Sequence, residues 1–511
     1  MTITARSFDY VVVGSGSAGA TLVGRLLADT SATVLLVEAG GPHDRPDIRD
    51  FTQTWRLFQP GSEVDWAFVS EPQEGCAGQI QSYSTGKVLG GSSSVNGMVW
   101  VRGNPADYDQ WAADGCTGWA FADVLPSFKA IEAFPGGDPA LRGTSGPVVT
   151  TTALTSGSDL ARGFCEVAHD LGYPPNDDYN GARQHGSGFT QLNATPEGIR
   201  QDAFSAFVQP YLDDPRLTVL TSTLATRILF DDQRRAHRIL LDVDGDEVGV
   251  DVAREVIVAA GTVNSPALLM RSGVGAGDDL QRLGIPVVAD IGEVGRNLAD
   301  HVVSVAARQV RDPDLSGRRA PMEVSIFAGR SRTGPPGTPA FQVQTYYVGK
   351  GWRRWPQAMF ALGAIHLHPT SRGTVTLSTP DVRKPPVIDP HLLSTPEDVA
   401  AQIEAYREIR RILAAPALDR WLVEGEHTPN VDDDQLTDAV REYSEADFHP
   451  VGTCRMGVDP SSVVDPNLRV RGVQGLRVVG AAVIPYLPSG NTNAPAMMTG
   501  DRLGRFIAAG D

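Results

Sequence analysis

The feature that most constrains the fold is a strand–turn–helix–strand unit in the first forty residues. The apolar run Tyr10–Val13 is followed by GSGSAG, by an apolar-periodic stretch from Ala20 to Ala28, and by a second run, Val34–Val37. Short apolar runs bounded by turn residues are typical of strands buried on both faces. Because such strands occur in parallel sheets covered by helices, the unit predicts an α/β sheet of that kind.

The glycines of the turn predict a dinucleotide site. Gly14, Gly16 and Gly19 form the pattern GxGxxG between strand and helix. Without side chains there, backbone amides and the positive end of the helix can approach a pyrophosphate. Glu38 closes the second strand, where its carboxylate can accept hydrogen bonds from the ribose of an adenosine. The motif fits both NAD and FAD.

A second loop of this kind favours FAD. The segment Lys87–Arg102 reads KVLGGSSSVNGMVWVR, in which Gly90 and Gly91 precede three serines. Two backbone-rich loops far apart in one chain suit a long, extended dinucleotide. We therefore predict FAD as the cofactor.

Chain length and the later strands predict two domains. At 511 residues the chain exceeds the roughly 250–300 residues at which a single core stops growing. Further buried-type strands at Glu255–Ala259 and Leu476–Val479 indicate one sheet assembled from both ends and the middle of the chain. Between them, strand-like pieces at Ala340–Val348 and Thr374–Leu377 alternate with helical pieces, which predicts a second sheet.

We therefore expect an α/β fold, α+β overall. A Rossmann-like FAD-binding domain with a parallel sheet is joined to a substrate-binding domain whose mainly antiparallel sheet is covered by helices. The FAD-binding domain is expected to be discontinuous and to comprise residues 1–143, 195–300 and 445–511. The substrate-binding domain is expected to comprise residues 144–194 and 301–444.

Charge and cysteine content narrow the partners and the compartment. The chain has 61 acidic and 44 basic residues and a net charge of -17, which disfavours nucleic acid and anionic membranes as partners. Its four cysteines are widely spaced without a CxxC pair, so we expect reduced thiols and no metal site. There is no signal-peptide pattern and no run of about 18 apolar residues. We expect a soluble, cytoplasmic protein without stable membrane insertion.

Several motifs together resemble those of the glucose-methanol-choline (GMC) oxidoreductases, which use FAD. They keep the family's order from about residue 8 to residue 508. The motifs are GSGSAG with EAG at Glu38–Gly40, VLGGSSSVNGMVWVRG, AAGTVNSP at Ala259–Pro266, GRNLADH at Gly295–His301, HPVGTCRMG at His449–Gly457, and VVDPNLRVRGVQGLRVVGAAVIP leading to NTNAP at Asn491–Pro495.

The resemblance implies how FAD is held. It places the Gly90–Ser94 loop along the pyrophosphate, Asn96–Val99 against the flavin ring, and the backbone of Ala225 against adenine. Relatives with covalent FAD attach it through a histidine where this chain has Val95, so non-covalent FAD is implied. The cofactor-binding residues that we expect are Gly14, Ser15, Gly16, Ser17, Ala18, Gly19, Glu38, Ala39, Leu89, Gly90, Gly91, Ser92, Ser94, Asn96, Gly97, Met98, Val99, Ala225, Ala260, Gly261, Gly480, Ala481, Asn491, Thr492 and Asn493.

Two residues are candidates for catalysis. Taking a hydride from an alcohol requires a base for the hydroxyl proton, and histidine suits this at neutral pH. Local sequence alone would fit His449 as a structural residue and Asn491 as a turn residue. The resemblance implies that His449 is the base and that Asn491 occupies the partner position, where relatives have His or Asn. An amide can position the alcohol but cannot titrate.

One segment departs from the family pattern, and one histidine of a family motif is not expected to be catalytic. Many relatives read Asp-Ala-Ser where this chain reads Gly480-Ala481-Ala482, which removes an acidic side chain near the diphosphate. His301, at the end of GRNLADH, is interpreted as a structural residue at the domain junction and is left out of the catalytic set.

The expected function is FAD-dependent oxidation of an alcohol to an aldehyde or ketone. The electron acceptor is O2, which makes an oxidase, or a quinone or other carrier, which makes a dehydrogenase; the sequence does not choose. Alternatives are a hydroxynitrile lyase-like enzyme with a structural flavin and a flavin-binding protein without chemistry. Phe448, Met98, Trp100 and the run Phe341–Tyr347 predict an apolar pocket wall and favour an apolar or aromatic primary alcohol. The sequence does not predict the oligomeric state.

Overall fold

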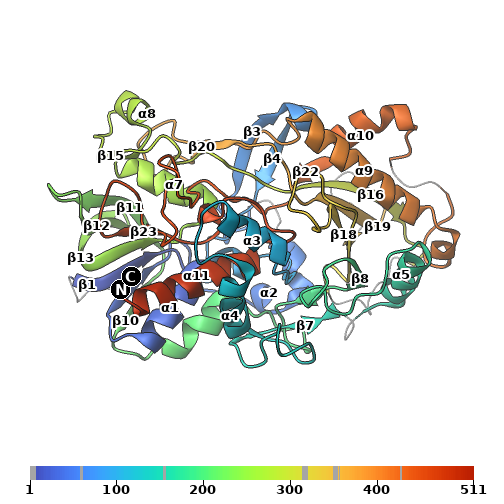
Figure 1. The fold of residues 1–511 in the computed structure, drawn as a ribbon, viewed down its shortest axis with the longest axis horizontal. Helices are drawn as coiled ribbons and strands as arrows, with labels where there is room; N and C mark the ends of the chain where they lie inside the picture. The colour runs from blue at the N-terminus through green and yellow to red at the C-terminus, as the bar shows by residue number, and fades with distance from the viewer. Residues whose placement is uncertain are drawn as a thin grey trace.

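Two large sheets lie toward opposite ends of the molecule (Figure 1). The structure is a computed structural model that describes residues 7–57, 61–153, 157–312, 320–348, 355, 357–425 and 429–510. One sheet has seven strands and the other has six. The Rossmann-like α/β sheet with a second, antiparallel sheet confirms the predicted fold class.

The seven-stranded sheet is parallel over most of its width. Its parallel strands are β10 (Leu217–Leu220), β2 (Val34–Val37), β1 (Ser7–Val13), β13 (Asp246–Val258) and β23 (Leu476–Val478).

The expected strand Glu255–Ala259 is the end of the longer β13. Its first half pairs antiparallel with β12 (Ala236–Val243), which pairs with β11 (Thr223–Phe230). Asp244 and Gly245 both have positive φ, as a two-residue hairpin turn requires, and so allow β12 and β13 to pair.

Helices cover this sheet and begin at the same edge. α1 (Ser17–Asp29) packs against α11 (Asn493–Ala508), and Figure 1 shows the two side by side. Their backbones are close, because a Cβ on Gly500 would lie 2.3 Å from the carbonyl oxygen of Ala18. The sequence pattern predicts a helix over Ser265–Arg271, but α7 (Gly261–Arg271) starts four residues earlier, since Gly261, at φ +76, leads directly from β13 into the helix.

The six-stranded sheet is antiparallel throughout. In order across the sheet it contains β22 (Ser444–Ala446), β16 (Val302–Gln309), β19 (Met359–His366), β18 (Phe341–Val348), β17 (Val324–Ala328) and β8 (Gly186–Phe189). The expected strand near residue 374 is not part of it: β20 (Thr374–Thr376) pairs with β21 (Val387–Asp389) in a separate small sheet.

The two faces of the six-stranded sheet differ. α9 (Pro396–Leu413) packs on β16 and β19, and α5 (Asp159–Asp170) packs on β8 and β17. The other face buries an apolar cluster that includes Val303 and Ile365. Val99, from the segment that follows the Gly90–Ser94 loop, belongs to the same cluster. Because side chains alternate along a strand, Gln342 and Gln344 of β18 lie on the face opposite Phe341 and Val343.

The remaining α-helices and strands are short and lie outside the two large sheets. They are α2 (Pro46–Arg49), β3 (Phe68–Gln73), β4 (Gln79–Tyr83), α3 (Pro105–Ala113), α4 (Phe121–Ile131), β5 (Glu132–Ala133), β6 (Val148–Val149), β7 (Thr151–Thr152), β9 (Gln191–Leu192), α6 (Ala203–Phe207), β14 (Val274–Gly275), α8 (Gly277–Arg282), β15 (Ala289–Asp290) and α10 (Leu436–Glu442). Among the described residues, no helix combines the length and apolar character needed to cross a membrane.

Candidate active site

The expected cofactor residues gather where the parallel strands end. β1, β2, β13 and β23 run in the same direction, so the segments that follow them meet at one edge of the sheet. Ala260 and Gly261 follow β13, and Gly480 and Ala481 follow β23 closely. β11, which contains Ala225, starts beside them, because the amide of its first residue donates to the carbonyl of Glu38 over 2.9 Å.

The two glycine-rich loops contact each other. Gly91 has φ +52, and a Cβ there would lie 2.7 Å from the Cα of Gly16. The amide of Gly90 donates to Oγ of Ser15 over 3.1 Å. Glycine is therefore required at this contact both by the backbone conformation and by the space.

Glu38 holds the first loop as well as ending β2. Its side chain is buried, and Oε2 accepts hydrogen bonds from the amide and the hydroxyl of Ser15 over 3.0 and 2.7 Å. Oε1 accepts from the amide of Gly40 over 2.8 Å. Burial raises the pKa of the Glu38 carboxyl, although these hydrogen bonds act in the opposite direction.

The helix ends at this edge offer free donors. α1, α7 and α11 begin there without a side-chain cap and without an acidic residue in the first turn. Their first amides have no partner within the helix, so an anion can bind them. Asn493 accepts a hydrogen bond from Oγ of Ser17 over 2.7 Å, while its buried Nδ2 has no partner among the described residues. This donor set suits a diphosphate and ribose hydroxyls.

The backbone explains the departure at Gly480. This residue has φ +101 and ψ -161, a region that is essentially restricted to glycine. A Cβ there would also lie 3.2 Å from that of Ala18. An aspartate at this position would be strained in this chain.

A buried arginine fixes the loop expected to face the flavin ring. Arg200 donates to the carbonyl of Ser93 over 3.2 Å, and to the carbonyl and Oδ1 of Asn96 over 2.7 and 2.9 Å. Met98, which follows in this loop, is fully buried and has φ +62, a strained conformation for this residue type. No motif pointed to Arg200.

His449 and Asn491 lie in direct contact. Nδ2 of Asn491 is 2.9 Å from Nε2 of His449. An amide nitrogen can only donate, so Nε2 of His449 accepts and carries no proton. The preceding residue, Phe448, has φ +60 and is 37% exposed.

His449 is positioned by pairing between two distant segments. The amide of Val451 donates to the carbonyl of Ala299 over 2.9 Å, and the amide of Asp447 donates to that of His301 over 3.0 Å. Between them, the amide of His449 donates to Oδ1 of Asp300 over 2.8 Å. This pairing brings the motif GRNLADH against the motif HPVGTCRMG.

The hydrogen bonds of His301 determine the tautomer of His449. Nε2 of His301 is 3.0 Å from the carbonyl oxygen of Leu367, which can only accept, so this nitrogen carries the proton. Its Nδ1 is then an acceptor, 3.1 Å from Nδ1 of His449. His449 therefore carries its proton on Nδ1 and presents the lone pair of Nε2 to Asn491.

Charge makes His449 more basic and His301 less so. Burial lowers the pKa of His449, but the carboxylates of Asp447 and Asp300 outweigh it, and the net shift is upward. Oδ2 of Asp447 is 3.2 Å from Nδ1 of His449. For His301, burial and the nearby charge of His449 hold the pKa far below its usual value, so its ring stays neutral.

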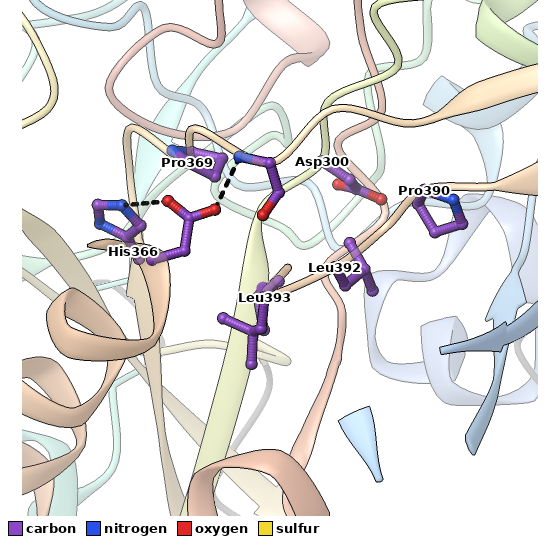
Figure 2. Close-up of a pocket in the computed structure, with 9 residues that line it drawn as sticks. Asp300, His366, Pro369, Pro390, Leu392 and Leu393 are labelled. Atoms are coloured by element: carbon purple, nitrogen blue, oxygen red, sulfur yellow. Dashed lines mark hydrogen bonds and ion pairs between the residues drawn. The ribbon is translucent and has the colours of Figure 1, made fainter. Parts of the chain in front are cut away.

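Asp300 is a buried carboxyl behind His449. Burial raises its pKa to about 7, and Oδ2 has no hydrogen-bond partner among the described residues. Figure 2 shows Asp300 and His366 among the residues that line a small cavity. The cavity has a volume of about 10 Å³, at the lower limit of the space that one water needs. A water there would supply the missing partner.

Comparison with known proteins identifies the family. Residues 8–303 match the GMC oxidoreductase N-terminal family and residues 369–500 the C-terminal family. This chain is a GMC oxidoreductase. It is 34% identical to the oxygen-dependent choline dehydrogenase of Brucella ovis, with 98% of this chain and 95% of that protein covered. The corresponding protein of Burkholderia pseudomallei is also 34% identical, over 98% of this chain and 94% of its own length.

Solved structures of GMC oxidoreductases share the fold over the whole chain. Pyridoxine 4-oxidase from Mesorbium loti has a TM-score of 0.91 and 30% identity, with 98% of each chain covered. A variant of formate oxidase from Aspergillus oryzae has a TM-score of 0.91 and 25% identity, covering 100% of this chain and 99% of that one. These findings confirm the predicted family, its cofactor FAD and the class of enzyme, an oxidoreductase acting on CH–OH groups.

In this GMC oxidoreductase, His449 and Asn491 also contact residues that the sequence analysis did not include in the catalytic set. His301, which we had interpreted as structural, contacts the ring of His449, and Asp447 contacts it from within the same segment. Gln342 and Gln344 both donate to Oδ1 of Asn491, over 3.3 and 3.2 Å. The β18 face toward the site is therefore polar at these positions, and the expectation that the whole run Phe341–Tyr347 forms an apolar wall is wrong.

Proposed function

We propose that this GMC oxidoreductase oxidises an alcohol to an aldehyde or ketone, with His449 as the base and Asn491 as the positioning amide. The observation that carries the proposal is the 2.9 Å contact between Nε2 of His449 and Nδ2 of Asn491, which can only donate and so favours an unprotonated Nε2. A substrate hydroxyl that displaces the Asn491 amide from this nitrogen would lose its proton to it, because Nε2 has a single lone pair. An alkoxide is a far better hydride donor than the neutral alcohol.

The residues that we propose to hold FAD are those gathered at the edge of the seven-stranded sheet. Bound there, FAD supplies the group that accepts the hydride. The amides of the Gly14–Gly19 turn and the Gly90–Ser94 loop would bind the diphosphate, and Glu38 would bind the ribose. Val95 has no nucleophilic side chain, which supports non-covalent binding.

The protein's own groups would hold the proton once it is transferred. Protonation gives His449 a positive charge, and Asp447 lies 3.2 Å from its Nδ1. Asn491 would keep the alcohol oxygen aligned, because its Nδ2 already points at the nitrogen that takes the proton. His301 would maintain the tautomer of His449 from the side away from the substrate.

We propose O2 as the electron acceptor, since relatives are named as oxygen-dependent and structural neighbours are named as oxidases. Choline is not carried over as the substrate. A quaternary ammonium is bound by a carboxylate or an aromatic face, and the carboxylate beside the base, Asp447, already pairs with His449.

We also propose the domain division at residues 143/144, 194/195, 300/301 and 444/445, on the basis of the segments that form each sheet. A cytoplasmic location is proposed because all four cysteines are buried as free thiols.

The test is anaerobic reduction of the flavin by a panel of alcohols that includes choline, pyridoxine and aryl alcohols. Bleaching by an alcohol would support oxidation, and no bleaching by any of them would contradict it.

His449→Ala should slow reduction by about a hundred- to ten-thousand-fold, with FAD still bound. Asn491→Ala should slow it while keeping the pH dependence, because the titrating group remains. A wild-type rate in His449→Ala would remove His449 from the role of base.

A further inference from the structure

One hydrogen-bonded chain connects the base to the middle of the six-stranded sheet. Tyr346 donates through its hydroxyl to Oε1 of Gln344 over 2.9 Å, and Nε2 of Gln344 donates to Oδ1 of Asn491 over 3.2 Å. Asn491 then donates to Nε2 of His449. On the far side of the ring, Nδ1 of His449 donates to His301.

The direction of this chain is set at its histidine end. Amides and hydroxyls can reverse, so the links from Tyr346 to Asn491 would be equally well made in either direction. The carbonyl of Leu367 cannot reverse, because it only accepts. It requires a proton on Nε2 of His301, so that Nδ1 of His301 accepts from Nδ1 of His449. Nε2 of His449 must then receive a hydrogen bond, which selects one orientation of the Asn491 amide.

That orientation needs donors on the other side of Asn491. With Nδ2 toward His449, the oxygen Oδ1 points to β18, where it accepts from Gln342 and Gln344. Both glutamines are buried, at 0% and 1% exposed, so water does not replace them. Without them Oδ1 would lose both donors, and the amide could turn.

We propose that Gln342 and Gln344 are positioning residues: they hold the Asn491 amide with Nδ2 toward His449 and so keep Nε2 of His449 as the unprotonated nitrogen. The inference builds on the proposed function, in which that nitrogen takes the alcohol proton. The two glutamines act through Asn491, without contact to His449 itself in the hydrogen bonds described.

The groups that face His449 are known from each neighbouring segment. Asp447 belongs to its own segment, and Asp300 and His301 come from the segment before β16. The facing groups of β18 and of the loop before α11 are uncharged amides. Replacing these amides by uncharged side chains therefore alters the hydrogen bond to His449 without changing the charge around it.

The decisive variant is Gln344→Glu, which keeps the shape but replaces a donor by a group that, when ionised, only accepts. The Asn491 amide should then turn, so that Nδ2 faces the new carboxylate and Oδ1 faces Nε2 of His449. An acceptor at Nε2 favours the protonated form, so we expect the apparent pKa of His449 to rise by about one unit or more. The double variant Gln342→Leu/Gln344→Leu should also raise the apparent pKa of His449, because an Asn491 amide that is no longer held from β18 can turn its oxygen toward Nε2.

The measurement is 15N NMR of histidine-labelled holoenzyme across pH, with the His449 signals assigned by their loss in His449→Ala. Tyr346→Phe removes a hydroxyl from the chain and should have a smaller effect of the same kind. Tyr347→Phe is the matched control, because its hydroxyl bonds Oγ of Ser158 on the opposite face of the same strand and not the chain. It should leave the His449 signals unchanged.

Flavin reduction provides the second readout. We expect the leucine double variant to lose about tenfold or more in the reduction rate, with little change in the alcohol concentration needed for half-saturation. Gln344→Glu should be slow at neutral pH and recover at higher pH. If both variants keep the wild-type tautomer and pKa of His449, the proposal is wrong even if the enzyme oxidises alcohols. If no alcohol reduces the wild-type flavin, the proposed function fails, while the NMR result still decides the role of the glutamines.

Discussion

Replacing Asp447 by asparagine should lower the pKa of His449 and move the pH dependence of catalysis to lower pH. The carboxylate and the ring are 3.2 Å apart, and their side chains are only 11% and 12% exposed. Two unit charges at this distance attract by about 5 kcal/mol at an effective dielectric constant of about 20, which is an upper bound. Opposite charges this close typically shift a pKa by about 1–3 units, and we expect a decrease of that size.

The sign follows from which form of His449 is active. In the proposed reaction His449 acts with Nε2 unprotonated, so the rate of flavin reduction in the wild type should rise with pH as His449 loses its proton. Because Asp447 raises that pKa, its removal lets the same rise occur at lower pH. The plateau should fall roughly tenfold, since a weaker base accepts the alcohol proton less readily.

Anaerobic stopped-flow reduction from about pH 5 to about pH 10 measures both effects. Asp434→Asn is the control, because it removes the same charge from an exposed position earlier in the chain. It should leave the profile in place. An apparent pKa in Asp447→Asn that equals or exceeds that of the wild type would refute the assigned ion pair.

Two further predictions concern stability and cofactor binding. Burial raises the pKa of Asp300 to about 7, so its ionisation costs folding stability as the pH rises from about 4 to about 7. Asp300→Asn keeps the acceptor for the His449 amide and should therefore raise Tm relative to the wild type at about pH 8 but not at about pH 4. An equal difference in Tm at both pH values would contradict the raised pKa of Asp300. Gly91→Ala should cost about 2–4 kcal/mol and lower the FAD content, because its Cβ would lie 2.7 Å from Cα of Gly16 at φ +52. Gly292→Ala, where nothing lies within 4 Å, is the control, and normal FAD content in Gly91→Ala would refute the contact.

The cofactor half of the molecule was predictable because its signals are local. The strand, the glycine turn and the helix that follow one another from Ser7 to Asp29 need only neighbouring residues to form. The start of α7 was missed, since it depends on Gly261 adopting a positive φ at the end of β13. The long first half of β13 was also missed, because it is stabilised by pairing with β12.

The catalytic half was predictable only in part. His449 and Asn491 were identified through the family resemblance, and the structure brings them together. The role of His301 could not be read from the sequence, because its contact with His449 depends on pairing between segments almost 150 residues apart. Asp447 lies two residues before the base, but only the conformation of Phe448 decides whether its carboxylate reaches the ring.

The glutamines of β18 did leave a signal in the sequence. In FQVQTYYV, two amides alternate with apolar or small residues, and side chains two apart on a strand share a face. A buried amide without a partner costs about 1–3 kcal/mol, so two on one face of a buried strand imply polar partners opposite them. Knowing which strand face meets which loop requires the register of the whole sheet, and a shift by one residue would point both amides toward α9. The pattern therefore predicts that a polar site faces β18, and only the structure shows that its partner is Asn491.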